Sequence, residues 1–158
     1  MMESVFKFII DSRKAFAELV DGLSADELNQ VPDGFNNNII WNFGHIVVST
    51  PLLCYVRTGI WPDAAKIKYV EAYKKGTKPT YEVNASELAD LKGLAISTIH
   101  TLEEDYKNGL FKQMEPFSTI TFGAVINTIE ELLATTVGHD NTHYGYAIAQ
   151  RRIIKNSK

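Results

Sequence analysis

Residues 121–153, TFGAVINTIEELLATTVGHDNTHYGYAIAQRRI, decide the fold. Residues that share one face of a helix recur here at alternating steps of three and four: Phe122, Val125, Ile129, Leu132, Thr136, His139, His143, Tyr146, Gln150 and Ile153. Such steps are typical of a helix that packs along its length in a bundle. The pattern therefore predicts a long C-terminal helix that begins near Thr121.

The N-terminal part of the chain predicts a second long helix and a short one. Over about residues 2–22 the apolar side chains recur at helical spacing, at Phe6, Ile9, Phe16, Leu19 and Val20. Residues 24–27, Ser-Ala-Asp-Glu, form a capping-box pattern that opens a short helix. The Pro-Asp-Gly at residues 32–34 ends it.

Two more long helices are predicted in the middle of the chain. One begins at an asparagine among residues 36–38 and runs to about residue 58, with a kink expected at Pro51. The other is capped by Ser86 and ends at about residue 108, before Gly109. Between them, residues 59–85 contain several helix breakers and predict a long connection with one short helix. The expected fold is one all-α domain over residues 1–158, a four-helix bundle whose helix order the sequence leaves open.

Composition limits the classes of function. The chain of 158 residues is 45% hydrophobic and 22% charged, and its formal net charge is −3. These values are ordinary for a globular protein and give no basic field for nucleic acid. We found neither a signal-peptide pattern nor a run of about 18 apolar residues, so we expect a cytoplasmic protein with no membrane partner. The one cysteine, Cys54, lies in an apolar run and is expected to be a buried small hydrophobe.

Two of the four histidines form a pair at a helical spacing. His139 and His143 are four residues apart, so both imidazoles project from the same side of the C-terminal helix and can bind one ion. Both occupy core-facing positions, where an unpaired imidazole costs about 1–3 kcal/mol. A metal ion removes this cost by taking the lone pairs of the neutral rings. Ordinary hydrogen bonds at the edge of the core are the alternative.

A metal held inside a bundle needs ligands from facing helices. His45 is the natural third ligand, because it shares an apolar stripe with Trp41 on the second long helix. A lone histidine there can also be structural. His100 lies off the apolar stripe of its helix and is expected to be solvated.

At this point the sequence resembles the DinB/YfiT-like superfamily of metalloenzymes. The resemblance rests on residues 41–46, Trp-Asn-Phe-Gly-His-Ile, and residues 139–145, His-Asp-Asn-Thr-His-Tyr-Gly. The linker at residues 73–80 and the Gln-Arg-Arg at residues 150–152 extend it over nearly the whole chain. It implies a four-helix bundle, commonly a homodimer, with His45, His139 and His143 as ligands of a divalent ion, nickel or zinc.

The resemblance also implies a reaction. Some relatives are similar to S-transferases that join a low-molecular-weight thiol, such as bacillithiol or mycothiol, to a small electrophilic substrate. Three neutral histidines leave the metal an open position that can hold a thiolate. The expected function is therefore a metal-dependent thiol transferase. Tyr146 departs from the glutamine that many relatives have there, which leaves the shape of the pocket open, and Trp41 and Asp140 are further candidates beside the metal.

Two other functions stay open at the level of sequence. A metal-dependent hydrolase needs a carboxylate base; Asp140 is the nearest candidate, but it is more simply a surface acid or a partner that orients an imidazole. A non-catalytic, stress-associated metal-binding bundle is the second alternative, and a fourth protein ligand would favour it. Glu130 and Glu131 are expected to be solvated, and Gly145 suggests a close contact between helices.

Overall fold

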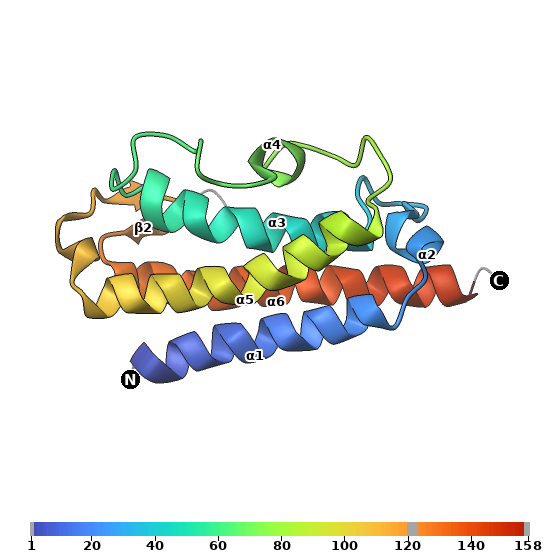
Figure 1. The fold of residues 1–158 in the computed structure, drawn as a ribbon, viewed down its shortest axis with the longest axis horizontal. Helices are drawn as coiled ribbons and strands as arrows, with labels where there is room; N and C mark the ends of the chain where they lie inside the picture. Colours follow the sequence, from blue (N-terminus) through green and yellow to red (C-terminus); the bar gives the residue numbers. More distant parts are fainter. Residues whose placement is uncertain (1, 120–122, 157–158) are drawn as a thin grey trace.

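Four long helices lie side by side in the computed structural model, which describes residues 2–119 and 123–156 (Figure 1). They are α1 (Met2–Asp21), α3 (Ile39–Pro51), α5 (Ala85–Lys107) and α6 (Ile129–Asn156). The shorter elements are α2 (Ala25–Asn29), the π-helical turn η1 (Leu52–Val56), α4 (Val70–Tyr73), the 3₁₀ turn η2 (Leu110–Gln113), and the paired strands β1 (Phe117–Ser118) and β2 (Val125–Ile126). The predicted all-α four-helix bundle is confirmed.

The structure supplies the helix order that the sequence left open. α1 packs mainly on α5 and α6, and α3 packs mainly on the same two helices. The linker after η1 runs back over the length of the bundle, so α3 and α5 point in the same direction while α1 and α6 point in the other (Figure 1). α3 therefore lies antiparallel to α6, and this pairing carries the site described below.

Most of the predicted helix ends are confirmed. Ser24 and Glu27 form the capping box of α2. Asn38 caps α3 by accepting a hydrogen bond from a backbone N–H, and Gly109 follows α5 with a φ of +77°. The predicted cap of α5 is wrong: Asn84, rather than Ser86, accepts the N–H of the third helical residue. An asparagine side chain is as good an N-cap as serine, so the sequence offered two candidates.

The predicted start of the last helix is also wrong. Val125 lies in β2, which pairs antiparallel with β1, and α6 begins only at Ile129. Thr128 and Glu131 form a capping box there, because each accepts a backbone N–H of the other. The predicted starting point at Thr121 and the neighbouring residue 122 lie outside the described residues. The spacing of three and four continued upstream of the cap by coincidence and concealed it.

The predicted effect of Pro51 is a kink, and the structure shows a change of helix type at this residue. The α-helix ends at Pro51, and the chain continues as the π-helical turn η1, in which the N–H of Arg57 donates to the carbonyl of Leu52 at 2.9 Å. Proline cannot donate to the helix ladder, and the wider turn follows directly after it. The result is a locally widened helix end that faces the hairpin of β1 and β2.

The stretch Ile39–Val56 is long and apolar enough to cross a membrane by length and composition alone. Polar residues such as Asn42 and His45 interrupt its apolar run, so the sequence alone predicts no membrane span here. In the structure 83% of this window is buried inside the bundle, as expected for a core helix.

A buried ion pair lies where the four long helices meet. Arg13 of α1 is 0% exposed, and its Nε donates to Asp140 of α6 at 2.7 Å. Its two Nη atoms donate to the carbonyl of Ala95 in α5 at 3.1 Å and to the carbonyl of Ile46 in α3 at 3.0 Å. Thr50 accepts a further bond from the same guanidinium. One side chain therefore connects α1 to all three other long helices.

Two glycines differ in what surrounds them. A Cβ on Gly44 in α3 would lie 2.5 Å from the ring of Tyr73, so here glycine lets the linker approach the helix closely. A Cβ on Gly145 in α6 would meet nothing within 4 Å. The close helix contact predicted at Gly145 is therefore wrong; the close contact is at Gly44, and it is made with the linker.

These surroundings predict opposite effects of alanine at the two positions. Gly145→Ala should stabilise the protein by about 1 kcal/mol, because alanine favours the helix and meets no neighbour. Gly44→Ala should destabilise it by about 1–3 kcal/mol, because the ring of Tyr73 must move. Denaturant unfolding of the two variants beside the parent measures both changes. Equal effects at the two positions would contradict the close approach of the linker.

The buried ion pair predicts a large and asymmetric response to mutation. Arg13→Met should lower the free energy of unfolding by about 3–5 kcal/mol, because it leaves the carboxylate of Asp140 buried without its cation. The double variant Arg13→Met with Asp140→Leu should recover most of this loss, since it removes both charges. Denaturant unfolding measures the changes, and Lys14→Met, at an exposed neighbouring position, is the control. A double variant no more stable than Arg13→Met alone would argue against an unpaired charge as the cause.

Candidate metal centre

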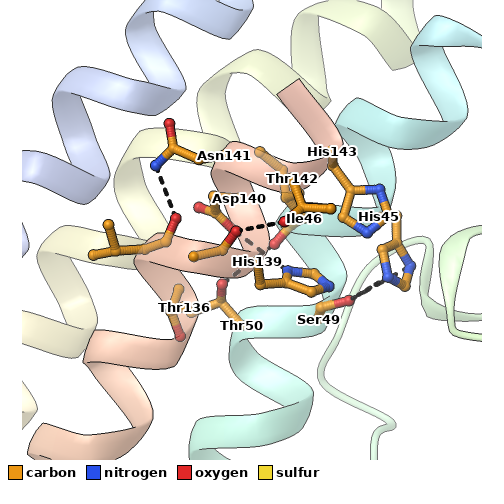
Figure 2. Close-up of polar contacts among 12 residues, drawn as sticks. His45, Ile46, Ser49, Thr50, Thr136, His139, Asp140, Asn141, Thr142 and His143 are labelled. Atoms are coloured by element: carbon orange, nitrogen blue, oxygen red, sulfur yellow. Dashed lines mark hydrogen bonds and ion pairs between the residues drawn. The ribbon is translucent and has the colours of Figure 1, made fainter. Parts of the chain in front are cut away.

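Three histidines meet between α3 and α6. His45 comes from α3, and His139 and His143 come from successive turns of α6 (Figure 2). One ring nitrogen from each lies within 4.8 Å of the others. The antiparallel pairing of α3 with α6 brings His45 opposite the pair, so the structure brings together the three residues that the sequence singled out.

The ring of His45 is held by the linker and by its own helix. Its Nδ1 lies 2.7 Å from the carbonyl oxygen of Tyr73. A carbonyl can only accept, so Nδ1 carries the proton and Nε2 keeps its lone pair. The indole of Trp41 stacks on this ring at 4.7 Å between centroids and 10° between planes, and it donates to Thr77 of the linker. The hydroxyl of Ser49 lies 3.3 Å from Nε2.

A buried amide fixes the protonation of His143 in the same way. The side-chain nitrogen of Asn42 donates to the backbone carbonyl of Asn38 at 2.9 Å and to Gln150 at 3.2 Å. The amide oxygen is therefore the atom that faces His143, 2.7 Å from its Nδ1. Since this oxygen accepts, Nδ1 of His143 is the donor and Nε2 keeps its lone pair.

His139 lies beside the buried ion pair. Its Nδ1 is 3.6 Å from Oδ1 of Asp140. The other oxygen of that carboxylate accepts from Arg13, whereas Oδ1 is buried without a hydrogen-bond partner among the described residues. The Nδ1 of His139 is the ring nitrogen nearest to this oxygen, so a carboxylate partner for the ring lies beside the cluster. Asp140 is 0% exposed, so its interpretation as a surface acid is wrong.

Burial keeps two of the rings neutral. Loss of hydration lowers the pKa of His45 to about 4 and that of His143 to about 3. The neighbouring imidazoles lower the pKa of each further, and Lys75 also lowers that of His45. The Arg13 guanidinium holds the pKa of Asp140 below its ordinary value, against the effect of burial. At neutral pH His45 and His143 therefore offer uncharged imidazoles beside an ionised carboxylate.

The donor set fits a divalent metal ion. Neutral imidazole nitrogens are preferred ligands of zinc and nickel, and each ligand histidine in such sites commonly donates its other nitrogen to a carbonyl or carboxylate. His45 and His143 have this arrangement. Within residues 2–119 and 123–156, no fourth histidine, cysteine or carboxylate joins the group. Three protein ligands leave a coordination position open, as in catalytic rather than structural zinc sites.

Comparison with known proteins places the chain in a family. The sequence profile of the DinB superfamily matches residues 9–147, which include all three histidines. The chain belongs to the DinB superfamily. The resemblance inferred from the two histidine motifs is therefore confirmed. No curated protein matches the chain, so membership of the DinB superfamily supplies the fold and the family of the site but no substrate.

A cavity of about 330 Å³ adjoins the histidines of this DinB-superfamily protein. α3, η1, the linker, the hairpin and α6 all contribute to its wall, through His45, Ser49, Leu52, Leu53, Val56, Arg57, Lys75, Phe117, Ser118, Thr119, Thr135, Thr136 and His139. This volume is at the small end for ligand pockets. The widened turn after Pro51 supplies Leu52, Leu53 and Val56 to this wall, and Arg57 follows it directly.

The remaining candidate residues lie at different distances from the centre. Trp41 contacts it directly through His45. Tyr146 is 51% exposed, and its ring centroid is 6.2 Å from that of His143, outside the cavity wall. His100 is exposed, as expected. Cys54 is fully buried, and burial raises the pKa of its thiol to about 12, so it is a small hydrophobe rather than a nucleophile.

Sequence reasoning missed three residues that hold the site. Arg13 follows Ile9 by four residues and precedes Phe16 by three, so the sequence did show a charge on the apolar stripe of α1. Asn42 lies three residues before His45, next to its face of the helix. Tyr73 acts through its backbone carbonyl, for which a sequence carries no signal at all.

The lowered pKa values predict how stability depends on pH in chelator-treated protein. In the unfolded chain both histidines titrate near 6.5, whereas in the folded chain His45 titrates near 4 and His143 near 3. As the pH falls below about 6.5, the unfolded state takes up protons that the folded state does not, so the free energy of unfolding should fall down to about pH 4. Above pH 6.5 the two groups should contribute no slope.

Denaturant unfolding between pH 8 and pH 4 measures this dependence, with His143→Gln as the comparison. Glutamine does not titrate, so the variant should show a shallower slope in the same window. The pKa of Asp140 is lowered, so loss of its ion pair belongs below this window. A parent protein whose stability is flat from pH 6.5 to pH 4 would show that the buried rings accept protons freely.

Proposed function

We propose that the chain binds one divalent metal ion through His45, His139 and His143, and uses it to transfer a low-molecular-weight thiol to a small electrophilic substrate. The observation that carries the proposal is the convergence of three imidazoles, one buried and two half-buried, two of which (His45 and His139) line a cavity, with no fourth ligand in the described part of the chain. Membership of the DinB superfamily supports it. Thiol pools of this kind are cytoplasmic, and the proposal includes that location.

A bound zinc or nickel ion supplies a positive charge that keeps a thiol ionised at neutral pH. The protein's own residues do the rest. The Tyr73 carbonyl and the Asn42 amide hold the rings of His45 and His143 in one tautomer and one orientation. The apolar wall of Leu52, Leu53 and Phe117 excludes water from the reacting groups. Both reactants are thereby held close together, which is the main contribution of such a site.

Hydrolysis is less well supported by the geometry. A hydrolase needs a carboxylate to act as a general base within hydrogen-bond reach of the attacking water. Asp140, the nearest carboxylate, is fully buried and paired with Arg13 at 2.7 Å. No aspartate or glutamate belongs to the cavity wall in the described part of the chain. These observations favour a ligand that needs no base, such as a thiol ionised by the metal.

The quaternary structure is a separate part of the proposal. The family resemblance implies a homodimer, and size-exclusion chromatography with light scattering tests it.

A non-catalytic metal-binding bundle remains the second candidate function, and the open coordination position argues against it.

The proposal predicts metal binding that depends on all three histidines. After reconstitution with zinc or nickel, the parent should hold about one ion per chain, and His45→Ala, His139→Ala and His143→Ala should each weaken binding by more than about 100-fold. His100→Ala, at an exposed histidine outside the site, is the matched control and should bind like the parent. Metal content by mass spectrometry and competition with a chelator measure both.

The same preparations test the reaction. Conjugation of bacillithiol, mycothiol or glutathione to a chlorinated aromatic electrophile should require metal, and should fall with metal content across the variants. A parent that holds no stoichiometric metal after reconstitution would defeat the proposal. Metal-dependent cleavage of an ester without thiol dependence would instead assign the hydrolase, and metal binding with neither activity would assign the non-catalytic bundle.

A further inference from the structure

The wall of the 330 Å³ cavity carries two cations and no acid. Arg57 follows η1, and Lys75 lies in the linker just after α4, so two segments far apart in sequence each place a positive charge on the same cavity. Among the residues of the described wall there is no aspartate or glutamate. The charge of these side chains is therefore not balanced within the cavity.

Neither cation is neutralised from outside the cavity. Within residues 2–119 and 123–156, the ion pairs involve other lysines and Arg13, and none involves Arg57 or Lys75. In the linker, Lys74 pairs with Glu71 and Lys68 pairs with Asp90. Among the described residues Lys75 has no such acid, and it is the linker lysine that lies on the cavity wall.

Arg57 is held at the cavity by an aromatic ring. Its guanidinium carbon lies 5.2 Å from the ring centroid of Phe117, which is also a wall residue. Such stacking occupies the face of the guanidinium and leaves its N–H groups free to donate in the plane. Thr119, on the same hairpin, has a buried hydroxyl oxygen without a hydrogen-bond partner in the described structure. The hairpin thus holds the planar cation of Arg57 through Phe117 and adds the hydroxyl of Thr119 to the same wall.

We propose that this cavity selects small organic anions, with Arg57 and Lys75 binding a carboxylate and the side chains of Leu52, Leu53 and Val56 receiving an apolar body. The inference rests on the proposed function, because that function says what reaction the bound anion undergoes. It names the substrate class of the site as an electrophile or thiol that carries a carboxylate. Binding itself needs no metal, so it can be tested independently.

The chemistry of the wall selects against the alternatives. A cationic ligand would meet two like charges and no acid. A neutral apolar ligand of the same shape would fill the cavity but make no charge-assisted hydrogen bond with either cation. A carboxylate matches the fork of the guanidinium and accepts from the lysine at the same time. The small volume limits the ligand to about the size of a single substituted ring.

Isothermal titration with 4-phenylbutyrate, 4-phenylbutanol and 4-phenylbutylamine tests the proposal, since the three probes share one apolar body. Titrations are made on the full chain as purified and after chelator treatment. The carboxylate should bind about tenfold more tightly than the alcohol in both preparations, and the amine most weakly. The double variant Arg57→Gln with Lys75→Gln should lose this preference while it keeps its affinity for the alcohol.

Lys78→Gln, in the same linker but outside the cavity wall, is the matched control and should keep the preference. Equal affinity of the parent for carboxylate and alcohol would overturn the inference, as would a preference that survives the double substitution. A preference for the carboxylate that disappears after chelator treatment would show that the metal ion attracts the carboxylate. That result would also overturn the inference. If the thiol-transfer assay fails while the parent still prefers the carboxylate to the alcohol, only the proposed reaction is rejected. The two failures are therefore distinguishable.

Discussion

The guanidinium of Arg13 is the constraint on which the rest of the structure depends. A buried cation must have its donors satisfied, and here the acceptors come from α3, α5 and α6. This requirement fixes the rotation and the height of those helices against α1 far more narrowly than apolar contacts alone, which tolerate sliding. Because Asp140 lies between His139 and His143 in sequence, fixing that carboxylate also fixes the turn of α6 that carries the pair. The three-histidine cluster therefore takes its register from an ion pair that lies beside His139.

The second determinant is the linker, which closes the site from outside the bundle. Its path is possible because Gly44 has no side chain where the ring of Tyr73 packs. The hydroxyl of Tyr73 donates to Glu87, and that of Tyr69 donates to Asp90, so two hydrogen bonds attach the linker to α5. The carbonyl of Tyr73 then reaches Nδ1 of His45, and Lys75 reaches the cavity. The linker, through the last residue of its short helix α4 and the nearby Lys75, thus sets the tautomer of one histidine and adds a positive charge to the pocket.

Sequence patterns predicted the features that depend on residue spacing within one helix. They did not predict the contacts between residues that are far apart in the sequence. The spacing of four residues placed His139 and His143 on one side of α6, and the apolar stripe around His45 pointed to the same core. The start of α6 was missed because an accidental spacing masked the Thr128–Glu131 cap. The helix order was not predictable, since it depends on how Arg13 and Asp140 satisfy each other across the bundle. The contact of Tyr73 with His45 could not be predicted either, because every residue has a backbone carbonyl.

The distribution of charge explains how an acidic chain can have an anion-binding cavity. With a formal net charge of −3, the protein as a whole does not attract anions, and salt screens surface charges beyond about 8–10 Å. Selectivity must therefore arise at the cavity itself, where Arg57 and Lys75 lie beside apolar side chains and no acid belongs to the described wall. The one carboxylate near the centre, Asp140, is neutralised by Arg13, so it does not oppose an entering anion. The same ion pair that orders the bundle thus also removes the negative charge that would otherwise repel a carboxylate or thiolate from the histidines.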